Sequence, residues 1–329
     1  MKQKPVVLLI FCILFVLITA ILSICVGASG ISLSQLWEAI VNGAGESAAS
    51  RIFWYVRLPR TCASLLAGAG LATAGTIVQI VLANHLASPG IIGVNAGAGL
   101  AITICGAAGV ISGWAMAGAA FAGALGATIM VVLAAKKSGA SKSTVVLGGI
   151  AVSACINAVT EAISSMVPDA ALTQADFRVG GFSSVSTGKL LPAAILIIVG
   201  IMIACTLGND LDVLSLGDDT ARSLGMSANK IRSLALVLSA LLAGASVSFA
   251  GLLGFVGLII PHIGRRFIGT QGNWLLPFSA LFGAGFVTLC DFLSRVIFQP
   301  YELPTGILLS FLGGPFFVWL LMKRKEAHK

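Results

Sequence analysis

Residues 5–27, PVVLLIFCILFVLITAILSICVG, form an apolar run without a charged residue, immediately after Lys2 and Lys4. A bilayer core of about 30 Å is crossed by about 20 residues of α-helix, so this run predicts a membrane span. It is longer than the apolar core of a cleaved signal peptide, about 7–15 residues, and no small-residue cleavage site followed by a polar segment comes after it. We therefore expect a retained first transmembrane helix rather than a leader.

Similar runs continue to the other end of the 329-residue chain, which is 57% hydrophobic and only 10% charged. The mean hydropathy of +1.02 excludes a soluble globule. Long continuous apolar runs, rather than alternating ten-residue segments, favour a helical bundle over a β-barrel. We predict an all-α polytopic membrane protein with a single domain over 1–329. Its ten spans are expected near 6–28, 61–83, 93–112, 114–135, 143–167, 190–207, 230–250, 252–268, 274–296 and 303–322.

The distribution of Lys and Arg predicts the orientation. Ten spans bring both termini to one side, and cytoplasmic loops are enriched in basic residues. Placing both termini in the cytoplasm puts fourteen of the 20 basic residues there. The net charge of +8 is therefore explained by membrane topology. The sequence has no basic stretch with interleaved aromatic residues, the pattern that would indicate nucleic-acid binding. Six basic residues fall outside and are not explained by this rule: Arg51, Arg57, Arg60, Arg178, Lys189 and Arg295.

The chain also resembles itself at an offset of 176 residues. The segment LLAGA at 65–69, with Ala-Gly at 74–75, recurs at 241–245 with Ala-Gly at 250–251. Five predicted spans separate the starts of the copies, so they cross in opposite directions, as inverted-topology repeats of transporters do. We predict repeat halves at roughly 57–168 and 230–322. The alternative is chance similarity between helices rich in Ala and Gly, whose small residues would still allow close packing.

Neither the seven cysteines nor the three histidines predict a metal site. The cysteines all lie in predicted spans without a Cys-x-x-Cys pair, and we expect them to pack as small apolar residues. His85, His262 and His328 lie in separate segments, with no spacing typical of ligands. We expect no metal and no cofactor to be bound by this chain.

The fifth span carries polar residues on one face. Asn157, Glu161 and either Ser164 or Ser165 are three or four positions apart, so their side chains share that face. An ionisable residue within a span is by default a candidate functional residue. This face is therefore expected to line a translocation path. The alternative is that Glu161 lies near the helix end or bonds to a neighbouring helix.

Several motifs together resemble one known family, the FecCD-type permeases of ABC importers. The resemblance covers nearly the whole chain, and the family takes up iron-siderophore complexes, haem or cobalamin, with the cobalamin permease among the similar members. It implies the fold of a type II ABC importer permease. The segments that carry it are RLPR at 57–60, NHLASPG at 84–90, GGF at 180–182, LGDDTARSLG at 216–225, GFVGLIIPH at 254–262 and ELPTG at 302–306.

Arg57 and Arg60 share one face at the start of the second span, on the outer side, and Arg295 ends the ninth span four residues after Asp291. Guanidinium groups form bidentate pairs with carboxylates and suit the docking of an acidic partner. The resemblance implies that these arginines receive glutamates from a substrate-binding protein. The alternatives are anchoring to lipid headgroups and, for Arg295, an internal pair with Asp291.

The polar loop at 208–229 falls in the cytoplasm. Asp218 and Asp219 open a short predicted helix that stops at Gly225, with acidic residues at its start and glycine at its end. The resemblance implies that this segment is the coupling element in a groove of the ATPase, although any polar loop helix would look similar. His262 is expected to cap a helix or touch the ATPase. The matching residues of the loop are Gly217, Asp218, Asp219, Ala221, Arg222, Leu224 and Gly225.

The resemblance also implies an inner gate, built from the stretch matching Asn84 and Leu86 and from the turn matching Lys142 and Ser143. Two departures from the family pattern affect it. His85 stands where the family has a proline, and Lys142 stands where it has a small hydroxyl residue.

The sequence contains no Gly-x-x-x-x-Gly-Lys-Ser/Thr loop to hold ATP phosphates and no paired nucleophile and base in its spans, so we do not expect an enzyme. The resemblance implies partners: two cytoplasmic ATPases that use ATP, a second permease subunit, identical or homologous, and an extracytoplasmic binding protein. The expected location is the bacterial cytoplasmic membrane, in contact with lipid. Iron-siderophore is the expected cargo, with haem or cobalamin as alternatives. An ion-coupled secondary transporter is the alternative from another class, with Glu161 as its titratable group.

Overall fold

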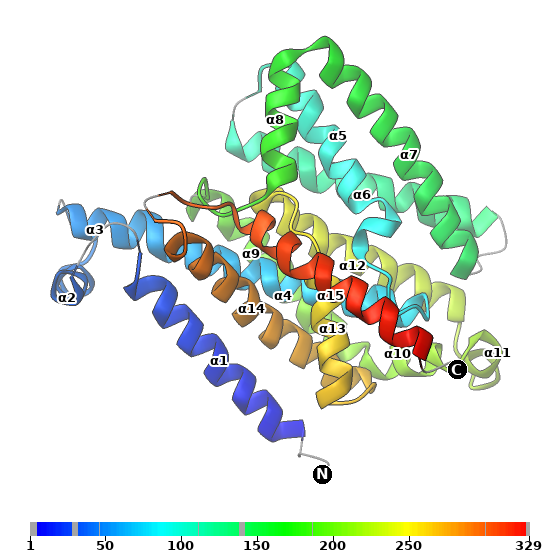
Figure 1. Ribbon diagram of the computed structural model, residues 1–329. Coiled ribbons are helices and arrows are strands. Elements are labelled where there is room, and N and C mark those ends of the chain that lie inside the picture. The colour runs from blue at the N-terminus through cyan, green and yellow to red at the C-terminus, as the bar shows by residue number, and fades with distance from the viewer. Residues whose placement is uncertain are drawn as a thin grey trace.

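The computed structural model describes residues 5–27, 32–45, 47–110, 112–137, 142–185, 187–299 and 301–326, and this part of the chain contains helices and turns but no strand (Figure 1). The all-α prediction is confirmed. The elements are α1 (Pro5–Cys25), α2 (Leu33–Val41), α3 (Ala48–Ile52), the π-helical η1 (Phe53–Arg57), α4 (Leu58–Val81), the 3-10 helix η2 (Pro89–Ile92), α5 (Val94–Ala107), α6 (Gly113–Lys137), α7 (Lys142–Met166), α8 (Pro168–Val179), α9 (Thr187–Thr206), α10 (Gly208–Ser215), α11 (Asp218–Ser223), α12 (Ala228–Ala250), α13 (Val256–Phe267), α14 (Gly272–Val296) and α15 (Thr305–Glu326).

Each predicted span coincides with a helix of the structure. Among the described residues, 6 helices are long and apolar enough to cross a membrane, and α9 with α10, which meet at a bend of 56°, would make a seventh. The apolar helices α5 and Thr305–Leu320 are shorter, and α13 has 12 residues. The chain is therefore a multi-pass membrane protein, and the number of ten crossings stays a prediction.

The core of the bundle is formed by α4 and α12. In their most apolar windows 83% and 72% of the residues are buried, against 22% for α1 and 17% for α7. Figure 1 shows α1 and α7 on opposite flanks of the bundle. The apolar side chains of these two helices therefore face the surroundings, where lipid or a second membrane chain would cover them.

Glycines let the central helices approach each other. A Cβ at Gly68 on α4 would lie 2.2 Å from the carbonyl oxygen of Gly283 on α14, and one at Gly244 on α12 would lie 3.0 Å from Cβ of Ala124 on α6. Gly68 and Gly244 are the equivalent glycines of the two LLAGA copies. In the predicted repeat α4 corresponds to α12 and α14 to α6, so the copies make equivalent contacts. The inverted repeat itself stays a prediction.

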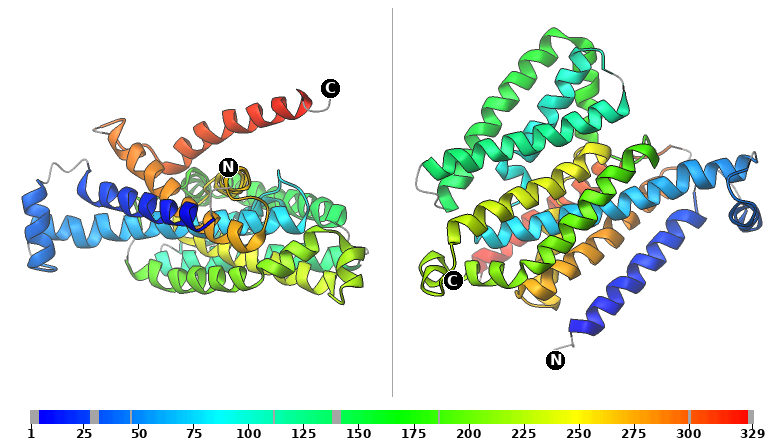
Figure 2. Two further views of the ribbon diagram at one scale, coloured as in Figure 1. Left: turned by 90° about the horizontal axis from the view of Figure 1, so that it is seen from below. Right: turned by 180° about the vertical axis from the view of Figure 1, so that it is seen from behind.

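Both described ends of the chain lie at the end of the bundle that carries α10 and α11 (Figure 1). The helices α2 and α3 lie at the opposite end, as the other views also show (Figure 2). We call these the α11 end and the α2 end. The arrangement agrees with termini on one side of the membrane, and the assignment of that side to the cytoplasm stays a prediction.

Candidate functional site

A buried ionic cluster lies at the α2 end, with Asp291 of α14 at its centre. The Asp291 side chain is completely buried. Nε and Nη2 of Arg60 donate to its carboxylate at 3.1 to 3.2 Å, Nε of Arg295 lies 3.2 Å from its Oδ2, and the hydroxyl of Thr305 donates to its Oδ1 at 2.9 Å. Arg60 also donates through Nη1 to Glu302 at 2.7 Å. Two guanidinium groups are thus held by one buried carboxylate and one that is partly exposed.

Arg57, the third predicted docking residue, is also turned into the protein. Its Nη1 donates to the carbonyl oxygens of Ile24 and Cys25 at 2.8 and 3.0 Å, so it caps the C-terminal end of α1. Arg295 contacts the same helix end through Ser23, whose hydroxyl is 2.7 Å from Nη2. The three arginines are at most 7% exposed. In the isolated chain they join α1, α4 and α14, and Arg295 has the internal ion pair that was the alternative to docking.

A short polar helix lies at the α11 end, as the sequence predicts. Helix α11 starts after Gly217, at φ +113°, and ends before Gly225, at φ +82°. Ala221 is its buried side chain and packs toward the bundle, while Asp219, Arg222 and the neighbouring Leu216 and Leu224 are exposed. Leu216 and Leu224 are 66% and 64% exposed, so this surface joins two large apolar side chains to charged ones.

Two acidic residues attach this surface to the bundle. Asp218 accepts a hydrogen bond at 2.5 Å from Nη2 of Arg232, a buried residue in the second turn of α12. That bond outweighs partial burial and lowers the pKa of Asp218. Asp212 of α10 accepts from the backbone N–H of Gly272, the first residue of α14, at 2.7 Å. Neither Asp212 nor Arg232 is among the site residues predicted from the sequence, although an arginine at the start of an apolar helix is a signal for an acidic partner.

The polar face of α7 lines a cavity of about 420 Å³. Asn157 and Glu161 are among its lining residues, and Glu161 is paired with Arg178 of α8. Ser164 does not line the cavity but donates to Oε1 of Gln174, which does, at 2.8 Å. The predicted face therefore borders a hollow, and the salt bridge is the contact with a neighbouring helix that was the alternative for Glu161.

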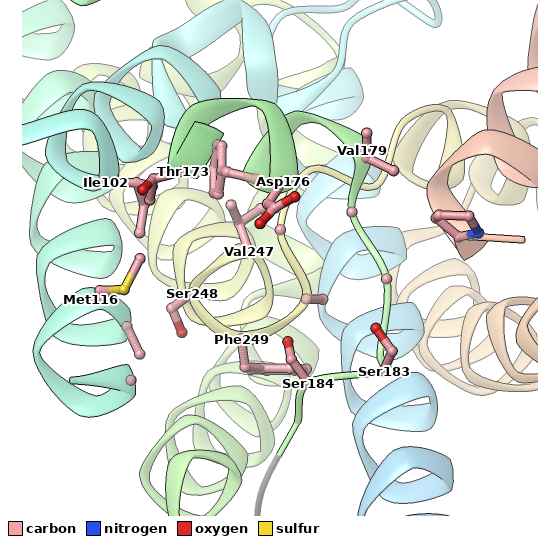
Figure 3. A pocket seen from close by; sticks show the side chains of 18 residues that line it. Ile102, Met116, Thr173, Asp176, Val179, Ser183, Ser184, Val247, Ser248 and Phe249 are labelled. Atoms are coloured by element: carbon pink, nitrogen blue, oxygen red, sulfur yellow. The ribbon is translucent and has the colours of Figure 1, made fainter. Parts of the chain in front are cut away.

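A second cavity of about 550 Å³ lies at the ends of α8 and α12, and its wall includes the Gly180–Gly181 turn (Figure 3). Asp176, Ser184 and Ser248 lie around it in this view. Phe177 lines both cavities, is 8% exposed and accepts a backbone hydrogen bond from Leu252 at 2.8 Å. Phe177 is thus the residue that the linings of the two cavities share.

The predicted gate residues lie on two separate segments. Asn84 is exposed and accepts from the backbone N–H of Leu86 at 2.9 Å, which shapes the turn after α4. Lys142 and Ser143 begin α7. The segments approach each other further along, where a Cβ at Gly149 would lie 2.0 Å from the carbonyl oxygen of Ile91. The gate stays a prediction.

His262 of α13 is half-buried and packs edge-on against Phe316 of α15, with ring centroids 5.7 Å apart. Its ring thus stabilises a helix–helix contact. Among the described residues, no group of three His, Cys, Asp or Glu side chains could hold a metal ion.

Comparisons with known proteins assign the family. The model of the FecCD transport family matches residues 14–323. The hemin transport system permease protein HmuU of Yersinia pestis is 32% identical over 333 residues, covering 99% of this chain and 98% of its own. The Fe(3+)-citrate import system permease protein YfmD of Bacillus subtilis (strain 168) is 37% identical over 307 residues, with coverages of 93% and 91%. A solved structure described as an inward-facing conformation of a putative metal-chelate type ABC transporter matches with TM-score 0.86 and 28% identity, over 97% of this chain and 100% of that one. The chain therefore belongs to the FecCD transport family, as a transport permease rather than an enzyme.

Proposed function

We propose that this chain is the permease subunit of a binding-protein-dependent ABC importer that carries an iron-siderophore complex across the cytoplasmic membrane. The observation that carries the proposal is the α11 surface. It is exposed and partly apolar, and hydrogen bonds attach it to α12 and α14. A partner that pushes on α11 would therefore move two helices that pack against the central α4.

The partner proposed for this surface is a cytoplasmic ATPase. The chain has no loop to hold ATP phosphates, so the energy has to come from another protein. Two ATPases would act on two permease subunits, a second copy or a homologue, and drive alternating access. Leu216, Arg222 and Leu224 are the proposed contacts, since their side chains are exposed. Ala221 and Asp218 would not contact the ATPase; they hold α11 against the bundle.

The translocation path is proposed to run along the cavity beside α7. Its lining combines Asn157 and Glu161 with Arg178 and Gln174 from α8, so a chelate with hydrogen-bonding groups would meet both charges. The low burial of α7 supports a path at the contact between two permease subunits. There, exposed residues of both chains would enclose the cargo.

The docking of a binding protein is proposed at the α2 end through Arg60. Arg60 is shared by two carboxylates, of which Asp291 is fully buried whereas the Glu302 side chain is 42% exposed. An incoming glutamate would take the place of Glu302 and leave the buried pair intact. Arg57 and Arg295 would then support the surface by holding α1 against α4 and α14.

The cargo rests on the family alone. A relative that imports ferric citrate and one that transports hemin are both similar over nearly the whole chain. Haem and cobalamin therefore remain the alternatives to an iron-siderophore. The chelate that stabilises the cognate binding protein against thermal unfolding would identify the cargo.

Reconstitution tests the proposed function. Proteoliposomes that contain the chain and its ATPase should take up the chelate from its binding protein only when ATP is present on the side of the membrane that carries the ATPase. Vanadate should stop this uptake. An ion-coupled secondary transporter, for which Glu161 is the titratable candidate, would instead follow a proton gradient. Uptake that depends on the proton gradient and is unaffected by ATP and vanadate would contradict the importer proposal.

A further inference from the structure

Helix α2 is a small independent element at the α2 end, and its own packing fixes its position. Ser32 and Gln35 form a reciprocal capping box at its start, with hydrogen bonds of 3.3 and 3.1 Å. Leu36 and Ala39 pack with Phe53 of η1 in a separate apolar cluster. The indole N–H of Trp54 donates to the carbonyl oxygen of Ala39 at 3.1 Å. The helix is therefore held in one orientation against α3 and η1.

That orientation is across the bundle. Figure 2 shows α2 running crosswise to α1 and to the α3–α4 rod, and in Figure 1 the same helix is seen nearly end-on. A helix perpendicular to spanning helices runs parallel to the plane of the membrane.

The contacts of Arg57 give the level of α2 in the bilayer. With 21 residues, α1 is about 32 Å long and spans the hydrocarbon core once. Arg57 caps its last turn, so position 57 lies where the core ends. The continuous rod Ala48–Val81 has 34 residues and is about 51 Å long, too long for the core alone. Its first turns, α3 and η1, therefore lie in the headgroup layer, and α2 packs on these turns.

The exposed surface of α2 is divided into two sides. Trp37, Ile40 and Val41 are apolar and are 69%, 46% and 66% exposed. Ser34, Gln35 and Glu38 are also exposed, and they flank this apolar face along one side of the helix. Since Leu36 and Ala39 already fill the contact with η1, the three large apolar residues form a second apolar face that nothing in the described chain covers.

The neighbouring turns extend this face with side chains suited to the edge of a bilayer. Tyr55 and Val56 are 63% and 50% exposed, and together with Arg51 they border a hollow of about 470 Å³. Tryptophan and tyrosine are enriched at membrane interfaces because their rings are apolar and their N–H or O–H groups bind water. Arginine adds a donor for lipid phosphates.

We infer that α2 is an interfacial anchor: it lies in the plane of the membrane and inserts Trp37, Ile40 and Val41 into the boundary between headgroups and acyl chains. The occupant of the face is lipid. Helix α2 lies next to the end of α1, where Ile24 packs against the Leu36–Ala39–Phe53 cluster, and Ile18 and Ile21 of α1 are 56% and 59% exposed and belong to the surface that lipid covers. An amphipathic helix at this level, with a tryptophan on its exposed apolar face, matches the apolar side of interfacial helices.

Photocrosslinking in lipid nanodiscs tests the anchor. Benzoylphenylalanine is placed at Trp37 or, as the matched control, at Glu38, which is exposed on the polar side of α2. Irradiated nanodiscs of phosphatidylethanolamine and phosphatidylglycerol are then analysed by mass spectrometry. We expect lipid adducts at position 37 to exceed those at position 38 by about fivefold or more. Equal yields, or adducts with an added binding protein instead of lipid, would overturn the anchor.

A fluorescence measurement checks the depth with a milder change. The emission lost in Trp37→Phe is the contribution of Trp37, one of five tryptophans. In nanodiscs this contribution should be quenched by lipids brominated near the headgroup end of the acyl chain. If acrylamide in water quenches it and brominated lipids do not, α2 lies in the aqueous phase and the inference is wrong.

Discussion

At the scale of single residues, the two carboxylates that form ion pairs with Arg60 differ in how much they contribute to stability. Asp291 is buried and contacts two arginines, whereas the Glu302 side chain is 42% exposed and contacts one. Removal of one partner from a buried ion pair leaves an uncompensated charge, and this costs far more than losing an exposed pair. The two positions should therefore separate stability from docking.

The first prediction uses this contrast. Asp291→Ala should lower the free energy of unfolding by about 3–5 kcal/mol, because Arg60 and Arg295 lose their shared carboxylate. Glu302→Gln should cost at most about 1 kcal/mol. Thermal unfolding of both purified variants measures the difference. Equal losses would show that Asp291 does not organise the cluster.

The second prediction concerns pH and Asp218. Its pKa is lowered below the ordinary 3.8 by the hydrogen bond from Arg232, so the bond stabilises the folded chain above about pH 4 and is lost as the pH falls through the lowered pKa. Asp218→Asn should cost about 1.5–3 kcal/mol at pH 7. Melting curves of variant and wild type between pH 7 and pH 2 should converge at the acid end. Ser227→Ala, at a cap without a side-chain hydrogen bond, is the control. A gap that persists in acid would contradict the pairing.

At the scale of elements, close helix contacts depend on glycines whose neighbours leave no room. A Cβ at Gly75 of α4 would lie 2.1 Å from the carbonyl oxygen of Gly257 in α13, whereas one at Gly126 of α6 would meet nothing within 4 Å in this chain. Gly75→Ala should therefore destabilise the protein by about 1–3 kcal/mol, and Gly126→Ala should not. Melting temperatures of the two purified variants in detergent provide the test. A stable Gly75→Ala variant would mean that α4 and α13 can separate at no cost.

Helix α11 and its C-cap residue Leu224 allow a similar comparison for coupling. Leu224→Asp should abolish stimulation of the ATPase and leave the melting temperature unchanged, because Leu224 is exposed. Ala221→Leu should destabilise the chain, since Ala221 is completely buried. ATPase activity and thermal unfolding are measured on the same preparations. Normal ATPase stimulation with Leu224→Asp would refute the proposed contact.

Elements were predictable where the signal is local. Apolar length predicted the helices, and Asp218 with Gly225 predicted the ends of α11. The buried cluster was not predictable in detail, because Arg60 and Asp291 are 231 residues apart and only folding brings them together. For the same reason, the hydrogen bonds of Arg57 and Arg295 to the end of α1 could not be predicted from the sequence. Helix α8 was also missed, although Pro168 at its first turn is a start signal.

At the scale of the whole molecule, the polar connections separate into two ends. The α2 end holds the arginine cluster and the interfacial helix, and the α11 end holds the coupling surface together with both described ends of the chain (Figure 1). Because the basic residues predict that the α11 end is cytoplasmic, the two ends would face different solutions and different partners. Cargo delivery and energy input are then tens of ångströms apart and are joined by α4, α12 and α14.

The last prediction tests this polarity. Ala44→Cys at the α2 end and Ser227→Cys at the α11 end are both exposed. An impermeant maleimide added to intact cells should label Ala44→Cys at once and Ser227→Cys only after the membrane is opened, because the reagent cannot cross lipid. The wild-type chain, whose seven cysteines are free, measures the background at each step. Labelling of Ser227→Cys in intact cells would show that the orientation is the reverse of the predicted one. The coupling surface would then lie on the side without ATP, which would contradict the proposed importer mechanism.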